Sequence, residues 1–355
     1  MQPVSTLNML FDFAYPNCWD ALKASRLPVV LYGMGNGADK VLDEFEQRNI
    51  KAAGVMASDG FVRHQDFRGF TVKSERELTG ELGDFTVALC FASALPDVMA
   101  AIENVGRRHE MIVPNVPVIG AEVLDDLFLE KNREKIEEAY ALLADETAKK
   151  TFSGALRFFY TGRLKYLKEI ETPKEEAFSA ILRLRDERYL DLGAYRGDTV
   201  EEFLRYTDGY EHITALEPNP KNFLKLKAYA ESIGRITLFN RGISDRGGKM
   251  FISKKGGRMA ALDVSDGVEI AVTCVDEINC SPTYIKADIE GFESKMLEGA
   301  AQTLKTKPKL NLAAYHRTSD FFSLILQLHR LNPDYRIYLR KHPYIPCWDL
   351  NIYAV

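Results

Sequence analysis

The stretch YLDLGAYRGD, residues 189–198, decides the fold of the C-terminal half of the chain. It reads as a short strand, then a loop from Gly193 to Gly197, then the start of a helix at Asp198. In an open α/β sheet, ligands bind outside the carboxyl ends of the strands, where this loop would lie. Glycines at both ends would let the backbone approach a ligand closely. The acid Asp191 disfavours a pyrophosphate there and favours an ammonium group.

Alternating strands and helices continue around this loop from about residue 172 to residue 355. Strands are predicted at residues 189–192, 213–216, 236–239, 284–287 and 309–314, with helices at residues 199–206, 219–233, 293–304 and 319–331. The chain ends in two further strands, at residues 335–341 and 349–354. The pattern predicts an α/β domain with a Rossmann-like, seven-stranded sheet whose terminal hairpin contributes an antiparallel strand.

Two more loops of this predicted sheet carry polar residues. Glu217 follows the second strand, where nucleoside-binding sheets place an acid that accepts hydrogen bonds from ribose hydroxyls, and Pro218 then stops the strand. The alternative for Glu217 is a plain surface carboxylate. Asn240 and Gly242 follow the third strand, on the adenine side of such a site or simply in a turn. With Asp191 beside an ammonium, this set suits S-adenosylmethionine.

Acids and a histidine follow the next two strands, on the side where a methyl acceptor would bind. Asp288 and Glu290 come directly after the strand at residues 284–287, and His316 follows the next strand. They could orient an acceptor, take its proton or ligate a divalent cation, although no spacing here demands a metal. A purely structural histidine is the alternative for His316. Glu293 is interpreted as an acid that favours the start of a helix.

These motifs, in this order, resemble the FkbM family of class I methyltransferases. The pieces that carry the resemblance are DLGAYRGD (191–198), EP (217–218), VDEI (275–278), IKADIEG (285–291) and LEGA (297–300). It covers about residues 140–355, including LADET (143–147) and YTGR (160–163). The resemblance implies O-methyl transfer from S-adenosylmethionine, onto a sugar or another small-molecule hydroxyl. One departure is the bulky pair Tyr195 and Arg196 in the glycine loop, which would change the shape of the cofactor pocket.

The predicted cofactor-binding set is therefore Asp191, Gly193, Tyr195, Gly197, Asp198, Thr199, Glu217, Pro218, Asn240, Gly242 and Asp288. The predicted catalytic set is Asp288, Glu290 and His316.

The first region, residues 1–120, also alternates strands and helices. Strands are predicted at residues 28–32, 52–56, 85–91 and 111–113, with a helix at residues 38–48. The order predicts a smaller Rossmann-like domain. LYGMGNG (31–37), GVMASD (54–59) and GFTV (69–72) resemble a Rossmann-like domain found ahead of sugar-modifying enzymes.

The glycine turn of this region offers a second candidate site. Gly33, Gly35 and Gly37 precede the helix, and free N–H groups at a helix start bind phosphate. A nucleotide or sugar nucleotide could bind there. The alternative is a docking domain that uses the turn without any ligand.

Residues 121–171, between the two sheets, are predicted to be a helical connector to the methyltransferase domain at residues 172–355. The segment is rich in Glu, Lys, Ala and Leu. An apolar stripe along it predicts packing onto the next domain, while its charged runs read as solvated faces. The stripe consists of Leu124, Leu127, Phe128, Ile136, Tyr140, Leu143, Phe152, Leu156, Phe158, Phe159, Leu164 and Tyr166.

Composition and net charge limit the classes of partner that the protein can bind. The 355 residues are 46% hydrophobic and 27% charged, as in ordinary globular enzymes. The net charge of −5 argues against a nucleic-acid partner, because phosphate contacts need a basic surface. The five cysteines are scattered without C-x-x-C spacing, which favours idle thiols over a zinc site or disulfides. No signal peptide or membrane span is recognisable, so a soluble, cytoplasmic protein is expected.

Two other functions remain to be weighed. The first is a nicotinamide- or sugar-nucleotide-binding oxidoreductase that uses the glycine turn at residues 33–37, but no Tyr-x-x-x-Lys set follows that turn. The second is a non-enzymatic, cofactor-binding partner protein. A mere binder does not need Asp288, Glu290 and His316 opposite the methyl group. The sequence therefore favours a methyltransferase acting on a small-molecule or carbohydrate hydroxyl.

Overall fold

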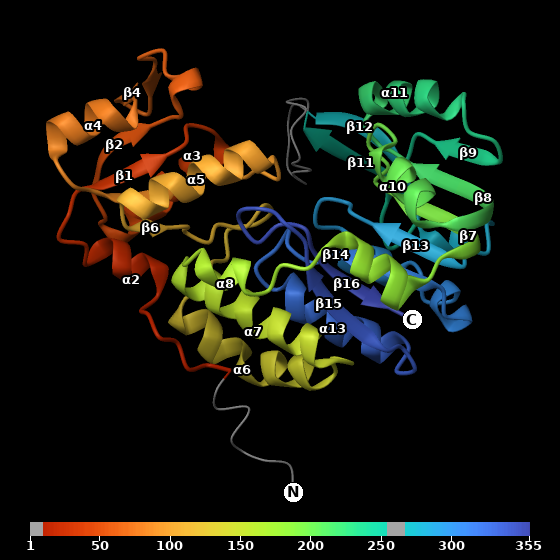
Figure 1. Cartoon of the computed structure of the whole chain (residues 1–355). Helices are drawn as coiled ribbons and strands as arrows, with labels where there is room; N and C mark the ends of the chain where they lie inside the picture. The colour runs from red at the N-terminus through yellow and green to blue at the C-terminus, as the bar shows by residue number, and fades with distance from the viewer. Residues whose placement is uncertain (1–9, 254–266) are drawn as a thin grey trace, which may run out of the picture.

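The structure is a computed structural model that describes residues 10–253 and 267–355, and it contains two large sheets joined by helices (Figure 1). The N-terminal sheet has six strands in the order β3-β4-β2-β1-β5-β6, and the neighbours of β1 are parallel to it. Its elements are α2 (Cys18–Lys23), β1 (Val29–Tyr32), α3 (Asn36–Arg48), β2 (Ala52–Met56), β3 (Asp66–Phe67), β4 (Phe70–Lys73), α4 (Glu75–Leu82), β5 (Thr86–Leu89), α5 (Pro96–Arg108) and β6 (Met111–Ile112). The predicted Rossmann-like layer is confirmed.

The C-terminal sheet has seven strands in the order β15-β16-β14-β13-β7-β8-β9. Only β16 opposes its neighbours, running antiparallel to β14 and β15 as the sequence predicts. The strands are β7 (Arg185–Leu192), β8 (Asp208–Leu216), β9 (Ile236–Phe239), β13 (Tyr284–Ala287), β14 (Lys309–Ala313), β15 (Ile337–Lys341) and β16 (Leu350–Ala354). The helices are α10 (Asp198–Tyr206), α11 (Pro220–Ala230), α12 (Glu293–Glu298) and α13 (Asp320–Leu331). Because β7, β8, β9, β13 and β14 are parallel, their following loops meet at one edge.

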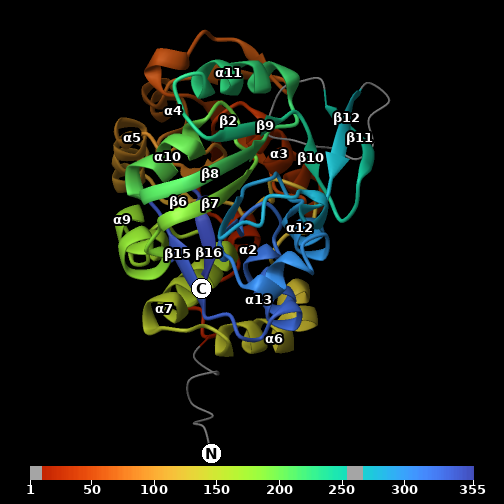
Figure 2. The same cartoon turned by 90° about the vertical axis from the view of Figure 1, so that its right-hand side faces the viewer.

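Two features of this half differ from the sequence-based prediction. The predicted helix at residues 293–304 ends at Glu298, because Gly299 is a poor helix former, and a short 3₁₀ turn (Thr303–Thr306) follows. A three-stranded sheet, β10 (Gly242–Ile243), β12 (Gly267–Thr273) and β11 (Gly248–Ser253), was not predicted. It stands to one side of the large sheet (Figure 2).

The helical segment between the sheets consists of α6 (Asp126–Ala141), α7 (Glu146–Thr161), α8 (Lys165–Lys168) and the short α9 (Lys174–Glu176). Asp125 and Asp145 cap α6 and α7 by accepting backbone N–H groups. Helix α6 packs on α13 and α7 on β15, as the apolar stripe predicts.

One member of the stripe is wrongly predicted. The Leu127 side chain is 76% exposed, because it lies on the outer face of the first turn of α6, whereas the neighbouring Phe128 is buried. The rest of the packing is extensive: a single apolar core takes residues from both sheets and from α6 and α7, including Tyr32, Phe152 and Phe321. The segment therefore joins the two sheets through a shared core.

The described part of the chain contains five free cysteines and no helix long and apolar enough to cross a membrane. Cys18, Cys90, Cys274 and Cys347 are buried, which agrees with the prediction of idle thiols. The first nine residues, on which the prediction of no signal peptide rests, lie outside the described residues.

Candidate cofactor and acceptor site

The structure brings the three predicted cofactor loops together through the Glu217 carboxylate. One carboxylate oxygen accepts the Tyr195 N–H at 3.0 Å, and the other accepts the Asn219 N–H at 2.8 Å. The Asn240 side chain donates to the Glu217 carbonyl at 2.8 Å, which ties the loop after β9 to the other two. These bonds fix the edge of the sheet at which the sequence places the cofactor.

Asp191 is a fully buried acid at the carboxyl end of β7. The Thr199 hydroxyl donates to one of its oxygens, and the other oxygen has no hydrogen-bond partner of good geometry among the described residues. Burial raises the pKa of Asp191 to about 6, and Lys286, its register partner on β13, opposes this rise. A buried acceptor oxygen that lacks a donor fits the ammonium group of S-adenosylmethionine.

Glu217 is only 5% exposed. Burial raises its pKa to about 7, although the hydrogen bonds from the N–H groups of Asn219 and Tyr195 lower it. A carboxylate has about four lone-pair sites, of which two are used here. The remaining ones suit the hydroxyls of a ribose. That role stays a prediction.

The two glycines of the C-terminal loop serve a purpose that the sequence did not reveal. A Cβ on Gly193 would lie 2.1 Å from the Asp288 carbonyl oxygen, and one on Gly197 would lie 2.3 Å from the Tyr229 ring. Both residues have positive φ, 86° and 104°. These glycines are therefore required by protein packing, whereas the sequence had suggested approach to a ligand.

The other predicted cofactor residues occupy the rim of this edge. The Tyr195 side chain is 43% exposed, and the Arg196 guanidinium lies 4.8 Å from the centre of its ring. Asp198 is exposed in the first turn of α10. Gly242 packs against Ile270, with Pro218 nearby. Both residues of the bulky pair are thus exposed.

The predicted acceptor residues also meet. His316 Nε2 lies 3.3 Å from Asp288 Oδ1 and 3.6 Å from Glu290 Oε2. His316 Nδ1 lies 3.1 Å from Glu293 Oε1, and both of these side chains are 1% exposed. The Tyr315 hydroxyl donates to Asp288. The side chains of Asp288 and Glu290 are 36% and 31% exposed, so an incoming acceptor can reach both carboxylates.

The charges of this cluster are strongly coupled. Burial lowers the pKa of His316, but Glu293 and Asp288 outweigh it and raise that pKa well above its ordinary value. Burial raises the pKa of Asp288, but Lys286 and His316 outweigh it and bring that pKa below its usual range. The imidazole is therefore protonated and Asp288 ionised at neutral pH. In this state His316 donates hydrogen bonds and has no lone pair with which to take a proton.

A metal ion is an alternative occupant of the same cluster. Asp288, Glu293 and His316 can each offer a ligand atom, and these atoms lie within 4.8 Å of one another. Metal binding would require neutral histidine. A cation and the imidazole proton are therefore alternative occupants of this cluster.

Lys286, Tyr315 and Glu293 were not predicted to belong to the site. Lys286 could have been found, because residues i and i+2 of a strand point to the same face and Asp288 is two residues on. Glu293 begins α12 as predicted, but its carboxylate turns back to accept the Ile289 N–H at 2.9 Å and to contact His316. No sequence signal indicated that Tyr315 would reach Asp288.

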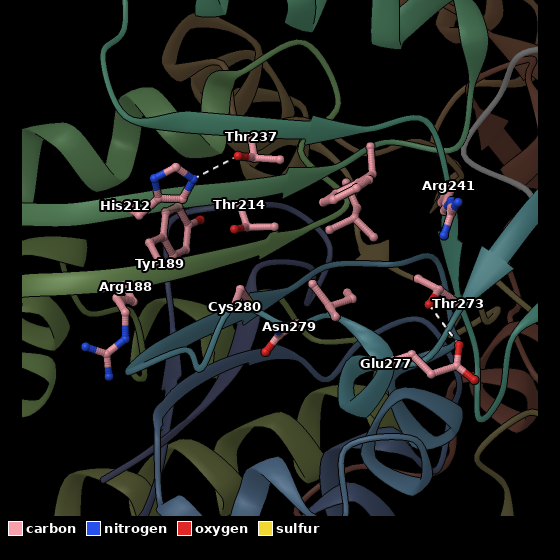
Figure 3. Close-up of a pocket in the computed structure, with 13 residues that line it drawn as sticks. Arg188, Tyr189, His212, Thr214, Thr237, Arg241, Thr273, Glu277, Asn279 and Cys280 are labelled. Atoms are coloured by element: carbon pink, nitrogen blue, oxygen red, sulfur yellow. Dashed lines mark hydrogen bonds between the residues drawn. The ribbon is translucent and has the colours of Figure 1, made fainter.

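A cavity of about 430 Å³ lies beside the cofactor edge, over strands β7, β8 and β9 (Figure 3). His212 Nε2 pairs with the Thr237 hydroxyl, and the Thr273 hydroxyl donates to Glu277. Arg241, next to Asn240, marks the end of the cavity nearest the predicted adenine side. The polar groups drawn as paired in Figure 3 satisfy one another, so nothing in their geometry calls for a ligand.

Known proteins resemble this chain in sequence and in fold. Residues 191–346 match the family model described as the methyltransferase FkbM domain. A crystal structure of methyltransferase FkbM from Methylobacillus flagellatus KT is similar over 98% of this chain and 97% of its own, with a TM-score of 0.71 and 22% identity. No curated protein matches.

Two further solved structures resemble only part of the chain. Precorrin-6y C5,15-methyltransferase from Geobacter metallireducens GS-15 is 14% identical over 50% of this chain and 83% of its own, with a TM-score of 0.32. Aeropyrum pernix fibrillarin, in complex with S-adenosyl-L-methionine, is 14% identical over 51% of this chain and 76% of its own, with a TM-score of 0.32.

The fold matches the Rossmann-like fold of methyltransferases. Residues 191–346 form a methyltransferase FkbM domain, as the sequence resemblance indicates.

Proposed function

We propose that this protein transfers a methyl group from S-adenosylmethionine to a hydroxyl of a small molecule such as a sugar or sugar nucleotide. The observation that carries the proposal is the convergence of three carboxylates at one sheet edge. Asp191 lies near the end of β7, and Glu217 and Asp288 directly follow its two neighbours β8 and β13, within a methyltransferase FkbM domain.

Asp191 and Glu217 bind the cofactor in this proposal. Asp191 offers a buried carboxylate oxygen to the ammonium group, and Glu217 accepts hydrogen bonds from the ribose. Asn240 holds the Glu217 backbone in place. Bound S-adenosylmethionine supplies an electrophilic methyl group on a cationic sulfur.

Asp288 receives the acceptor. Its ionised, partly exposed carboxylate accepts a hydrogen bond from a hydroxyl and repels an acceptor that is itself a carboxylate. The Tyr315 hydroxyl, Lys286 and His316 fix the orientation of that carboxylate. The acceptor oxygen bonds to the methyl carbon while the carbon–sulfur bond breaks, and its proton leaves through the carboxylates of Asp288 or Glu290 to water.

In this scheme His316 positions the Asp288 carboxylate and does not touch the acceptor. As an imidazolium it lies 3.3 Å from Asp288 and 3.1 Å from Glu293 and holds the Asp288 carboxylate in place, so it acts through Asp288. The general-base role predicted from the sequence would first require the His316 imidazolium to lose a proton. Against the oxidoreductase alternative, which uses the N-terminal glycine turn, residues 191–346 match a methyltransferase domain.

The test is transfer of labelled methyl from S-adenosylmethionine to a panel of sugars, sugar phosphates, nucleotide sugars and phenols. We expect a labelled product that resists mild alkali, as an ether does. Asp288→Asn should lower turnover about 100-fold, because the carboxylate that receives the acceptor is lost, and should leave cofactor binding unchanged, because Asp191 and Glu217 stay in place.

Asp334→Asn is the matched control. Asp334 is an exposed acid between α13 and β15, outside the acceptor cluster, so this variant should retain full turnover. A label released as methanol by alkali would indicate a carboxylate acceptor and contradict the proposal. Full activity of Asp288→Asn would remove Asp288 from the reaction.

A further inference from the structure

A second cavity, of about 590 Å³, lies between the two halves of the protein. Its N-terminal wall consists of the start of α3 with Gly35, the end of β5 and the segment at residues 113–118. Its C-terminal wall includes Tyr315 and Arg317, which follow β14, and Trp348 from the turn between β15 and β16. The volume falls within the roughly 300–1,000 Å³ typical of small-molecule sites.

This cavity adjoins the cluster of Asp288, Glu290 and His316, where we place the methyl acceptor. Tyr315 lines it, and the hydroxyl of the same residue donates to Asp288. The segment at residues 113–118 leads into Ile119, whose N–H donates to the His316 carbonyl at 2.8 Å. A molecule in the cavity is therefore one side chain away from the carboxylate that receives the acceptor.

The charged groups of the cavity are all positive. Among the described lining residues, the side chains charged at neutral pH are Lys40 and Arg317, and no described carboxylate forms a salt bridge with either. Lys40 Nζ donates to the carbonyls of Pro117 and Val118 at 2.7 and 2.8 Å, which leaves one of its three hydrogens. This balance is unusual in a chain of net charge −5, and it favours an anionic ligand.

The backbone adds to this positive potential. Helix α3 has 13 residues, and Gly35 precedes it at the N-cap position, where no described side chain makes a capping hydrogen bond. A Cβ on Gly35 would meet no atom within 4 Å, so this end of the helix is open. The Asn115 side-chain nitrogen, which also lines the cavity, is buried and has no hydrogen-bond partner among the described residues. These donors match the oxygens of a phosphate.

The opposite wall is aromatic. The rings of Tyr315 and Trp348 are stacked with centres 6.2 Å apart, and Tyr344 lies 5.7 Å from Trp348. Such a wall packs against the flat face of a base or a sugar ring. The cavity thus offers an anion site at one wall and a stacking surface beside the methyl acceptor site.

We infer that the methyl acceptor is a phosphate-bearing small molecule that spans this cavity. Its phosphate binds at Lys40 and the N-terminus of α3, and its ring packs on Trp348. Its hydroxyl reaches Asp288. This inference rests on the proposed function and deepens it, because the glycine turn of the N-terminal half then belongs to the acceptor pocket of the methyltransferase.

The test uses the full chain with substitutions at Gly35. Gly35 has φ −117°, which ordinary residues adopt, and open space around its Cβ position. Asp and Asn are both good helix caps at this position, so both variants should fold at least as stably as the natural protein. They have nearly the same size and differ in charge. Gly35→Asp places a negative charge in the anion site, and Gly35→Asn is its neutral control.

Inorganic pyrophosphate is titrated into each protein by calorimetry at low salt, with malonate as a dicarboxylate of similar charge. We expect pyrophosphate to bind the natural protein most tightly and Gly35→Asn more weakly, because the Asn side chain caps some of the same N–H groups. Gly35→Asp should bind it roughly tenfold or more weakly than Gly35→Asn, because like charges repel at close range. Equal pyrophosphate binding by the two variants, no pyrophosphate binding at all, or tighter binding of malonate would overturn the inference.

S-adenosylmethionine is titrated into the same samples. All three proteins should bind it equally, because Gly35 lies on the other sheet. Absence of S-adenosylmethionine binding in the natural protein would defeat the proposed function whatever pyrophosphate does. Normal S-adenosylmethionine binding with no effect of charge at Gly35 would defeat only the inference about the acceptor.

Discussion

The two glycine loops of this protein look alike in sequence and differ in what surrounds them. In the C-terminal loop, protein atoms already fill the space beside Gly193 and Gly197. In the N-terminal loop, Gly35 faces open space in a cavity, and α3 begins there without a side-chain cap. Gly37 of the same loop resembles the C-terminal pair, since a Cβ on it would lie 2.3 Å from the Cys90 carbonyl.

This difference separates two uses of glycine that a motif cannot distinguish. One use lets a loop pack tightly enough to hold an acid such as Asp191 or Glu217 in position. The other leaves backbone N–H groups of a helix open to an anion. In our proposal Asp191 and Glu217 bind the cofactor at the C-terminal loop, whereas Gly35 belongs to the ligand surface at the N-terminal loop.

The largest expected effect is the difference in stability between two variants that each add one methyl group, one in each loop. Gly193→Ala forces a Cβ against the Asp288 carbonyl at a φ of 86°, so we expect a loss of about 3 kcal/mol in the free energy of unfolding. Gly35→Ala should stay within about 0.5 kcal/mol, as open sites do. Urea denaturation measures both. Equal stabilities of the two variants would show that the loops do not differ in packing.

A smaller effect should appear in the pH dependence of cofactor binding. The pKa of Asp191 is raised to about 6, so its carboxyl is protonated below that pH and no longer attracts an ammonium group. The affinity for S-adenosylmethionine should fall roughly tenfold from pH 8 to pH 5, since about nine-tenths of this carboxyl is then neutral. Calorimetric titrations at several pH values measure it.

Asp191→Asn is the control for this pH dependence. It should bind the cofactor weakly at every pH, with a flatter profile that reflects Glu217 alone. A carboxyl with a raised folded-state pKa contributes stability at low pH that is lost as the pH rises through 6. Asp191→Asn should therefore gain more stability over the natural protein at pH 8 than at pH 5. An unchanged pH profile in this variant would exclude Asp191 as the responsible group.

Much of the C-terminal half could be predicted because its signals are local. The strand before Gly193, the acid that follows the next strand and the terminal hairpin are each contained in a few consecutive residues. The three-stranded sheet at residues 242–273 was missed because short strands without clear alternation resemble loops. The exposure of Leu127 was missed because an apolar residue at the edge of a stripe reads like its neighbours.

The contacts within the site depend on distant parts of the chain. The partner of Gly193 is the carbonyl of Asp288, and nothing in the glycine loop reveals it. The second cavity brings Lys40 and Trp348 to one space, which only the shared core of α6, α7 and both sheets determines. A sequence motif identifies the residues of one loop, whereas packing decides which loops face each other.

The most direct test of this account is titration of S-adenosylmethionine into the natural protein, Glu217→Ala and Gly35→Asp. The account predicts equal binding by the natural protein and Gly35→Asp, with roughly tenfold or weaker binding by Glu217→Ala, because a buried acceptor of hydrogen bonds is lost. Normal binding by Glu217→Ala together with loss of binding in Gly35→Asp would place the cofactor on the N-terminal loop and contradict it.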